Sequence, residues 1–143
     1  YRYRSVDWRP GARLRKQLRD CRVAVVTTAG LHRPDQPAFD LVEKGGDVTS
    51  RTIARGTDLS TLRTSHKSIA FDTESLKTDP NVALPLDRLE ELTAAGTIGA
   101  VSPIHLSFMG SISAPTRLVQ RSAPAAARAS HDARADIVLL TPV

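Results

Sequence analysis

The feature that most constrains the fold of this chain is a pair of short, uninterrupted apolar runs, one near each end. Residues 23–26 read Val-Ala-Val-Val, and residues 137–140 read Ile-Val-Leu-Leu. Such runs are typical of strands covered on both faces in a parallel sheet, whereas half-exposed strands alternate apolar and polar residues. We therefore expect residues 22–28 and 136–141 to be buried parallel strands of one sheet.

The sequence between these runs predicts alternating strands and helices. The expected elements are short strands at 48–54 and 97–101, a helix at 85–95 that packs through Leu86, Leu89 and Leu92, and an Ala-rich helix at 115–131. The segment PIHLSFMGS, residues 103–111, is expected to be a loop. This order predicts an α/β fold: a layered domain with a mainly parallel, Rossmann-like sheet that could be incomplete at the C-terminus.

Basic residues are concentrated at the N-terminus. Residues 1–22 hold eight Arg and Lys against two Asp, in a chain whose net charge is +5. We therefore divide the chain into a basic, aromatic arm at 1–21 and an α/β reductase-like domain at 22–143. Arginines beside Tyr1, Tyr3 and Trp8 could bind single-stranded nucleic acid by phosphate contacts and stacking. We favour an arm that packs on the domain or on an acidic partner, and expect no nucleic-acid binding.

Cysteine content and hydropathy indicate where in the cell the protein is located. Cys21 is the only cysteine, which excludes an internal disulfide and a cysteine-based metal cage. No apolar stretch approaches the roughly 18 residues that would span a membrane. We therefore expect a cytoplasmic protein without membrane contact.

Polar side chains gather in three predicted loops. The segments HRPDQPAFD, TSHKSIAFD and PIHLSFMG contribute the candidate catalytic residues His32, His66, His105, Asp72 and Ser107. The first and third loops follow predicted strands, where doubly wound sheets collect their ligands. We therefore expect the three histidines to converge beyond the ends of strands 22–28 and 136–143, around a small-molecule substrate.

Several chemistries fit such a cluster. His66, His105 and Asp72 could bind a divalent metal, or a histidine could act as an acid or base near neutral pH. A Ser-His-Asp triad lacks its G-x-S-x-G turn, and no motif for a nucleotide cofactor is present. Each histidine could also simply satisfy the backbone of its own loop.

Six segments resemble one protein family in their order and spacing. They are RYRSVDWRP, AVVTTAGLHRPDQPAFD, SHKSIAFD, DPNVALPLDRLEEL, GTIGAVSPIHLSFMG and DIVLLTPV. Together they cover nearly the whole chain, which resembles the glycine/sarcosine/betaine/D-proline reductase family, in particular its selenoprotein B-type subunits.

The resemblance implies an oxidoreductase that cleaves a small amine reductively. A selenocysteine or cysteine attacks the carbon next to the amino group, the C–N bond breaks, and a dithiol system, which could be thioredoxin-like, restores the catalytic residue. The resemblance places that Cys or Sec directly after the segment LLTPV, and Cys21 does not align with it. It also implies assembly into homo- or hetero-oligomers with other reductase subunits.

Two other functions stay open on the sequence alone. The same scaffold could carry different chemistry on the His/Asp cluster, including a metal site, or the chain could be a non-catalytic binding module that uses its basic arm. A sheet that ends at residues 136–143 would leave its last strand uncovered. We therefore expect the functional polypeptide to continue beyond Val143, or another chain to cover that strand.

Overall fold

A computed structural model describes residues 11–143, so the aromatic residues of the predicted arm lie outside the described part of the chain. The centre of the fold is a five-stranded sheet. Its strands are β1 (Arg22–Thr27), β3 (Arg51–Ala54), β5 (Ala100–Val101), β6 (Ile104–Ser107) and β7 (Ile137–Thr141). β1 pairs in parallel with β7 on one side and with β5 and then β6 on the other. β3 lies antiparallel beside β6. The fold is α/β with a mainly parallel sheet, which confirms the prediction.

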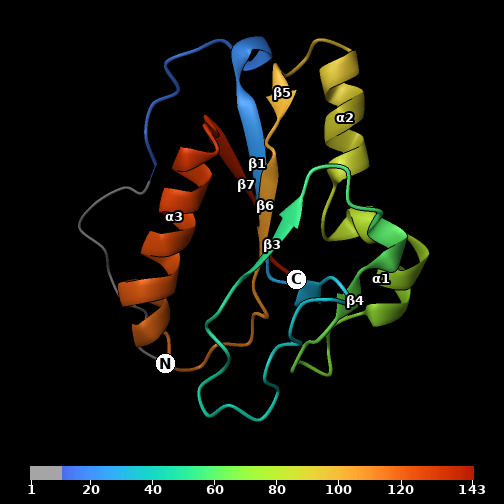
Figure 1. The fold of residues 1–143 in the computed structure, drawn as a ribbon, viewed down its shortest axis with the longest axis vertical. Helices are drawn as coiled ribbons and strands as arrows, with labels where there is room; N and C mark the ends of the chain where they lie inside the picture. The colour runs from blue at the N-terminus through green and yellow to red at the C-terminus, as the bar shows by residue number, and fades with distance from the viewer. Residues whose placement is uncertain (1–10) are drawn as a thin grey trace.

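Helices cover both faces of the sheet, as Figure 1 shows. α3 (Ala123–Asp132) lies on one face, and α1 (Thr73–Thr78) and α2 (Leu86–Ala94) lie on the other. A π-helical turn at Leu118–Ser122 leads directly into α3, whose first turn contains Pro124. Short 3-10 turns lie at Leu18–Asp20, Leu59–Thr61 and Pro80–Val82. No helix in residues 11–143 is long and apolar enough to cross a membrane.

A small second sheet lies beyond the end of β1. β2 (Leu31–His32) and β4 (Arg63–Thr64) pair antiparallel, Leu31 opposite Thr64 and His32 opposite Arg63. This pairing brings two loops that are more than 30 residues apart in sequence to the same end of the central sheet. It therefore positions both His32 and the segment that follows β4.

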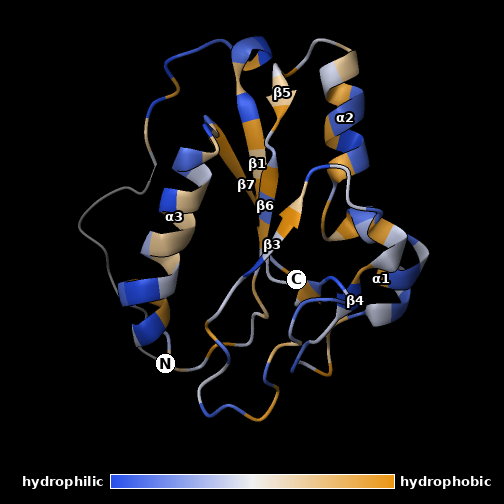
Figure 2. Cartoon of the chain, viewed as in Figure 1, coloured by the Kyte–Doolittle hydropathy of each residue, from blue (hydrophilic) through white to orange (hydrophobic). Residues whose placement is uncertain are grey.

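The main core lies between the sheet and the face that carries α1 and α2. Val23 and Val25 of β1 pack there with Ile53 of β3 and with Leu86 and Leu89 of α2. Figure 2 shows the strands as the most hydrophobic part of the chain, while the outer faces of α1 and α2 are hydrophilic. Burying side chains of this kind stabilises a domain by roughly 25 cal/mol per Å² of apolar surface.

Three predictions about individual elements are wrong. The segment predicted as a loop at 103–111 contains β6, an inner strand of the sheet. Leu92 is 40% exposed, because six residues of helix turn it by about 120° away from Leu86. β7 pairs with β1 as predicted but is not buried: Val138, Leu139 and Leu140 are all exposed. The strand predicted at 48–54 is confirmed only over Arg51–Ala54.

Candidate active site at the carboxyl edge of the sheet

The parallel strands β1, β6 and β7 end together, and we call this end of the sheet the carboxyl edge. Their last residues are Thr27, Ser107 and Thr141. The N–H of Phe108 donates to the Thr27 carbonyl at 2.9 Å, and the N–H of Thr28 donates to the Thr141 carbonyl at 3.2 Å. Ligand sites of open α/β sheets lie outside this edge, so its side chains are the first candidates for chemistry.

The chain that leaves β7 is held against β1. The N–H of Val143 donates to the hydroxyl of Thr28 at 3.0 Å. The hydroxyl of Thr141 donates to the carbonyl of Ala83, just before α2, at 2.7 Å. These two bonds direct the end of β7 across the carboxyl edge.

A close contact at Gly30 brings the segment after β4 to the same edge. Gly30 has φ +63°, and a Cβ there would lie 2.1 Å from the carbonyl oxygen of Ser65. Only glycine fits a positive φ and such an approach without strain. The N–H of Ser65 donates to the Gly30 carbonyl at 2.9 Å, and the Thr64 hydroxyl donates to the Ala29 carbonyl at 2.6 Å. His66 follows directly.

His66 presents an unused N–H at this edge. Its Nδ1 accepts a hydrogen bond from the N–H of Ser68 at 3.1 Å, so the neutral ring carries its proton on Nε2. That Nε2 is buried and has no hydrogen-bond partner among residues 11–143. It faces the backbone of Gly110, where a Cβ would lie 3.1 Å from it. Phe71 packs against the ring at 4.6 Å between centroids, and burial lowers the pKa of His66, which keeps the ring neutral.

His32 lies nearby but is fully engaged. Its Nε2 is 3.0 Å from the hydroxyl of Ser65, and its Nδ1 is 3.1 Å from the carbonyl of Arg33. The carbonyl can only accept, so Nδ1 donates and Nε2 accepts from Ser65. The ring is buried and makes an edge contact with Phe39. His32 therefore supports the residue next to His66 and leaves no ring nitrogen free.

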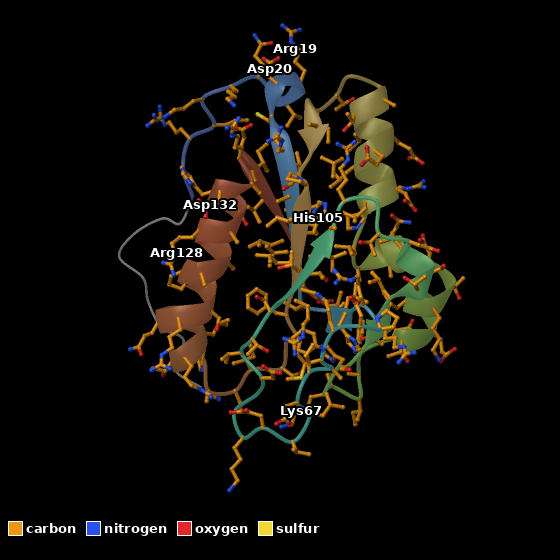
Figure 3. All side chains as sticks on the ribbon, in the orientation of Figure 1. Arg19, Asp20, Lys67, His105, Arg128 and Asp132 are labelled. Carbon is orange, nitrogen blue, oxygen red and sulfur yellow. The ribbon has the colours of Figure 1, made fainter. Side chains whose placement is uncertain are left out.

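His105 lies in the middle of the molecule. In Figure 3 its label lies between that of Arg19 at the top and that of Lys67 at the bottom. Val23 of β1 pairs with Val101 of β5, and Val26 of β1 pairs with Leu106 of β6. Two residues of β1 lie between these pairs, opposite four residues of the β5–β6 segment, so the pairing is irregular there. The N–H of Val25 donates to Nδ1 of His105 at 3.0 Å instead of to a backbone carbonyl. The imidazole thus replaces a missing backbone acceptor where the hydrogen bonding between β1 and β6 is irregular.

Burial of His105 strongly favours its neutral form. The side chain is fully buried, and desolvation lowers its pKa to about 4, with Glu90 opposing and Arg55 adding to the shift. Nε2 has no hydrogen-bond partner among the residues that the structure describes. His105 therefore lies within the strand, two residues before the carboxyl edge, and is not beside His66.

Asp72 and Ser107 also have backbone partners. Asp72 caps α1, accepting from the N–H groups of Glu74 and Ser75 and from the Ser75 hydroxyl, and the Ser75 hydroxyl does most to hold its pKa below the usual range. Ser107 is buried and accepts from the N–H of Leu31 at 2.7 Å. Within residues 11–143 no three His, Cys, Asp or Glu side chains are grouped so as to hold a metal ion. The predicted metal ligands His66, His105 and Asp72 are therefore not brought together.

Part of the predicted cluster does meet at the carboxyl edge. His32, His66 and Ser107 surround the turn after β1, whereas His105 and Asp72 have structural positions elsewhere. Sequence reasoning missed Thr28 and Gly110, which lie beside the buried, unpartnered Nε2 of His66. Their signal was their place directly after apolar segments, in TTAG and FMG, where a strand ends and a turn begins.

Known proteins are similar to this chain over most of its length. The model of the family glycine/sarcosine/betaine reductase selenoprotein B matches residues 3–142. The D-proline reductase subunit gamma of Acetoanaerobium sticklandii is 31% identical over 134 residues, which cover 94% of this chain and 52% of that protein. The chain thus spans about half the length of this curated relative. No solved structure matches the chain significantly.

The family match covers every element of the fold, from β1 to β7, and the carboxyl edge as far as residue 142. The relative is itself a reductase subunit. The chain belongs to the glycine/sarcosine/betaine reductase selenoprotein B family.

Proposed function

We propose that this chain forms part of a reductase that cleaves the C–N bond of a small amine-type substrate, and that its carboxyl edge is one wall of the active site. Membership of the reductase family supports the reaction class. The observation that carries the location is the path of the chain after β7. Val143 is hydrogen-bonded to Thr28, which also borders the backbone position that Nε2 of His66 faces.

The catalytic nucleophile in this proposal is a Cys or Sec that follows residue 143. Its thiolate or selenolate attacks the carbon next to the amino group and forms an S–C or Se–C bond. The C–N bond breaks, and the amine leaves with the electron pair of that bond and takes up a proton. A dithiol then supplies two electrons, releases the reduced product and restores the thiol or selenol.

His66 acts in this scheme as a hydrogen-bond donor. Its lowered pKa keeps the ring neutral, and the bond from Ser68 directs the remaining proton to Nε2. A neutral imidazole N–H in a water-poor site stabilises negative charge without losing its proton. We assign to it the anionic nucleophile or a carboxylate of the substrate.

The assembly and the substrate belong to the same proposal. The relative is a subunit of D-proline reductase, which supports action together with other reductase subunits. A thioredoxin-like dithiol would be a suitable reductant. The individual amine, and a cytoplasmic location, stay predictions from the sequence.

Substitution of His66 tests the proposal in the assembled, full-length enzyme, by measuring cleavage of the substrate C–N bond with a dithiol reductant. We expect His66→Ala to lower kcat/KM by about 100-fold, which is typical for loss of one positioned donor. His66→Gln retains an N–H at a similar reach and should restore part of the loss. Ile69→Ala is the control, since this neighbouring side chain is fully exposed.

Two results would contradict the assignment. If His66→Ala is as active as Ile69→Ala, the carboxyl edge does not take part through His66. If the assembled wild-type enzyme neither releases amine from glycine, sarcosine or betaine nor opens the ring of D-proline in the presence of the dithiol, the reaction class itself is wrong. These two failures are distinguishable because the second concerns the unaltered enzyme.

A further inference from the structure

Positive charge is concentrated at one end of the described chain. Residues 11–22 hold five Arg and Lys and one Asp, whereas residues 23–116 hold eight Arg and Lys and eleven Asp and Glu. The basic segment leads into β1 at the end of the sheet where β1, β5 and β7 begin, opposite the carboxyl edge (Figure 1). We call this end the amino edge.

The end of α3 adds to this charge. Two hollows of about 440 and 730 Å³ adjoin at the amino edge, because both are lined by Lys16 and Asp136. Figure 3 shows Arg19 and Asp20 at this end of the molecule. Among residues 11–143, only Asp20 and Asp136 contribute carboxylates to the two linings. Six basic side chains line the hollows, and we call them the basic patch: Arg13, Arg15, Lys16, Arg19, Arg22 and Arg134.

Most of the basic patch is not neutralised from within. Lys16 pairs with Asp136 at 2.8 Å, and the guanidinium of Arg22 donates to the carbonyl of Ala133 at 3.2 Å. The other four side chains form no ion pair or hydrogen bond with any residue in 11–143. Residues 1–10 hold three arginines and one aspartate, so they do not supply the missing negative charge. Like charges held together repel one another, and an anionic surface from outside would relieve this repulsion.

Leucines lie between these cations. Residues 13–19 read Arg-Leu-Arg-Lys-Gln-Leu-Arg, and Leu14 and Leu18 are 48% and 46% exposed. Protein interfaces combine arginine with apolar side chains that docking removes from water. Single-stranded nucleic acid is bound instead by cations together with aromatic stacking, and residues 11–22 contain no aromatic side chain. The basic patch therefore fits a protein surface better than a nucleic acid.

We propose that the basic patch docks an acidic surface of another subunit of the same reductase, with Leu14 and Leu18 covered at its centre. The proposal rests on the proposed function for the class of partner and adds the place where that partner binds. Docking at the amino edge leaves the carboxyl edge, with His66, free for the substrate. Complementary charge speeds association and fixes the orientation of the two subunits.

The experiment uses the full-length protein, with the other purified subunits of the reductase as the probe. Sedimentation velocity measures the subunit concentration at which half of this protein is bound, at low and at high salt. The double variant Arg15→Glu, Arg19→Glu should raise that concentration about tenfold at low salt and much less at high salt, because salt screens surface charges. Arg134→Glu, on a separate segment, should act in the same direction. At saturating subunit concentrations, kcat should equal that of the wild type.

Arg88→Glu is the matched control, because this exposed arginine lies on α2 and lines neither hollow. It should change the half-binding concentration by less than about twofold, as is usual for one exposed ion pair. Circular dichroism identifies any variant that has lost its fold. Wild-type affinity in both patch variants would overturn the proposal, and so would an equal loss of affinity in Arg88→Glu.

The same variants distinguish two other occupants. If a single-stranded oligothymidylate binds the wild type but not the patch variants, while the subunits still assemble, the basic patch binds nucleic acid. If the isolated protein self-associates and the patch variants do not, the occupant is a second copy. Either result overturns the proposal. Sedimentation reports assembly and not cleavage, so a failure of docking is distinguishable from a failure of the proposed reaction.

Discussion

The buried ring of His105 makes the stability of this domain depend on pH. In the folded chain its pKa is lowered to about 4, mainly by desolvation, whereas an unfolded histidine titrates near its ordinary value of about 6.5. Between these values the unfolded chain binds more protons than the folded chain. Stability is therefore complete above about pH 6.5 and is lost as the pH falls towards 4.

We expect the free energy of unfolding to fall by about 2 kcal/mol between pH 7 and pH 5 through this residue. Urea unfolding at the two pH values measures it. The carboxylates with lowered pKa, such as Asp72 and Asp79, act at lower pH and contribute little in this window. His105→Asn keeps an acceptor for the Val25 N–H but does not titrate, so its pH dependence should be flatter. An equal slope in this variant would contradict the assignment.

Gly30 and Gly56 offer a matched pair for testing the close approach at the carboxyl edge. Both have positive φ, but only Gly30 has a neighbour, the Ser65 carbonyl at 2.1 Å from an added Cβ, whereas Gly56 has open space. Gly56→Ala should cost about 1 kcal/mol for its backbone conformation. Gly30→Ala should cost clearly more, because the Ser65–His66 segment must move. Similar losses in thermal unfolding would show that the approach is not tight.

Sequence reasoning located the loops of the site but not the atoms that define it. Placing His32 and Ser107 near one edge needed only the rule that parallel strands end together. His66 reaches this edge through the antiparallel pairing of β2 and β4, which that rule does not cover. The roles of their ring nitrogens and hydroxyls depend on backbone partners such as Leu31 and Ser68, which no sequence pattern specifies.

At the scale of elements, the leucines of α2 show that helical spacing alone does not make a residue buried. Leu89 is 6% exposed and Leu92 is 40% exposed on the same helix. We expect Leu89→Ala to lower the free energy of unfolding by about 2–5 kcal/mol, the usual range for a buried leucine. Leu92→Ala should cost well under half as much. Denaturant unfolding of both variants is the measurement, and equal losses would mean that α2 packs through a different face.

β6 escaped sequence reasoning for a physical reason. Its residues Ile-His-Leu-Ser alternate apolar and polar side chains, which resembles an exposed strand or a loop. Both polar residues are nevertheless buried, because His105 bonds to Val25 and Ser107 bonds to Leu31. β1 was predicted correctly because its apolar run needs no such partners.

For the whole molecule, the order of strands and helices was sufficient to predict the layers but not how completely they are covered. The parallel pairing of β1 and β7 joins residues more than 100 positions apart, and apolar runs at both ends predicted it. The same runs could not reveal that β7 has β1 as its only strand neighbour within the described residues. An apolar run shows that a strand needs cover, without showing what supplies it.

Hydrogen exchange across the sheet tests this unequal coverage. β1 has strands on both sides, so its amides should exchange only with global unfolding. In β7 the Asp136 N–H bonds to the Arg22 carbonyl, and alternation then turns the amides of Val138 and Leu140 towards β1 and that of Leu139 outwards. We expect the Leu139 amide to exchange much faster than those of Val138 and Leu140, as measured residue by residue by NMR. Slow exchange at Leu139 would mean that another strand pairs with β7.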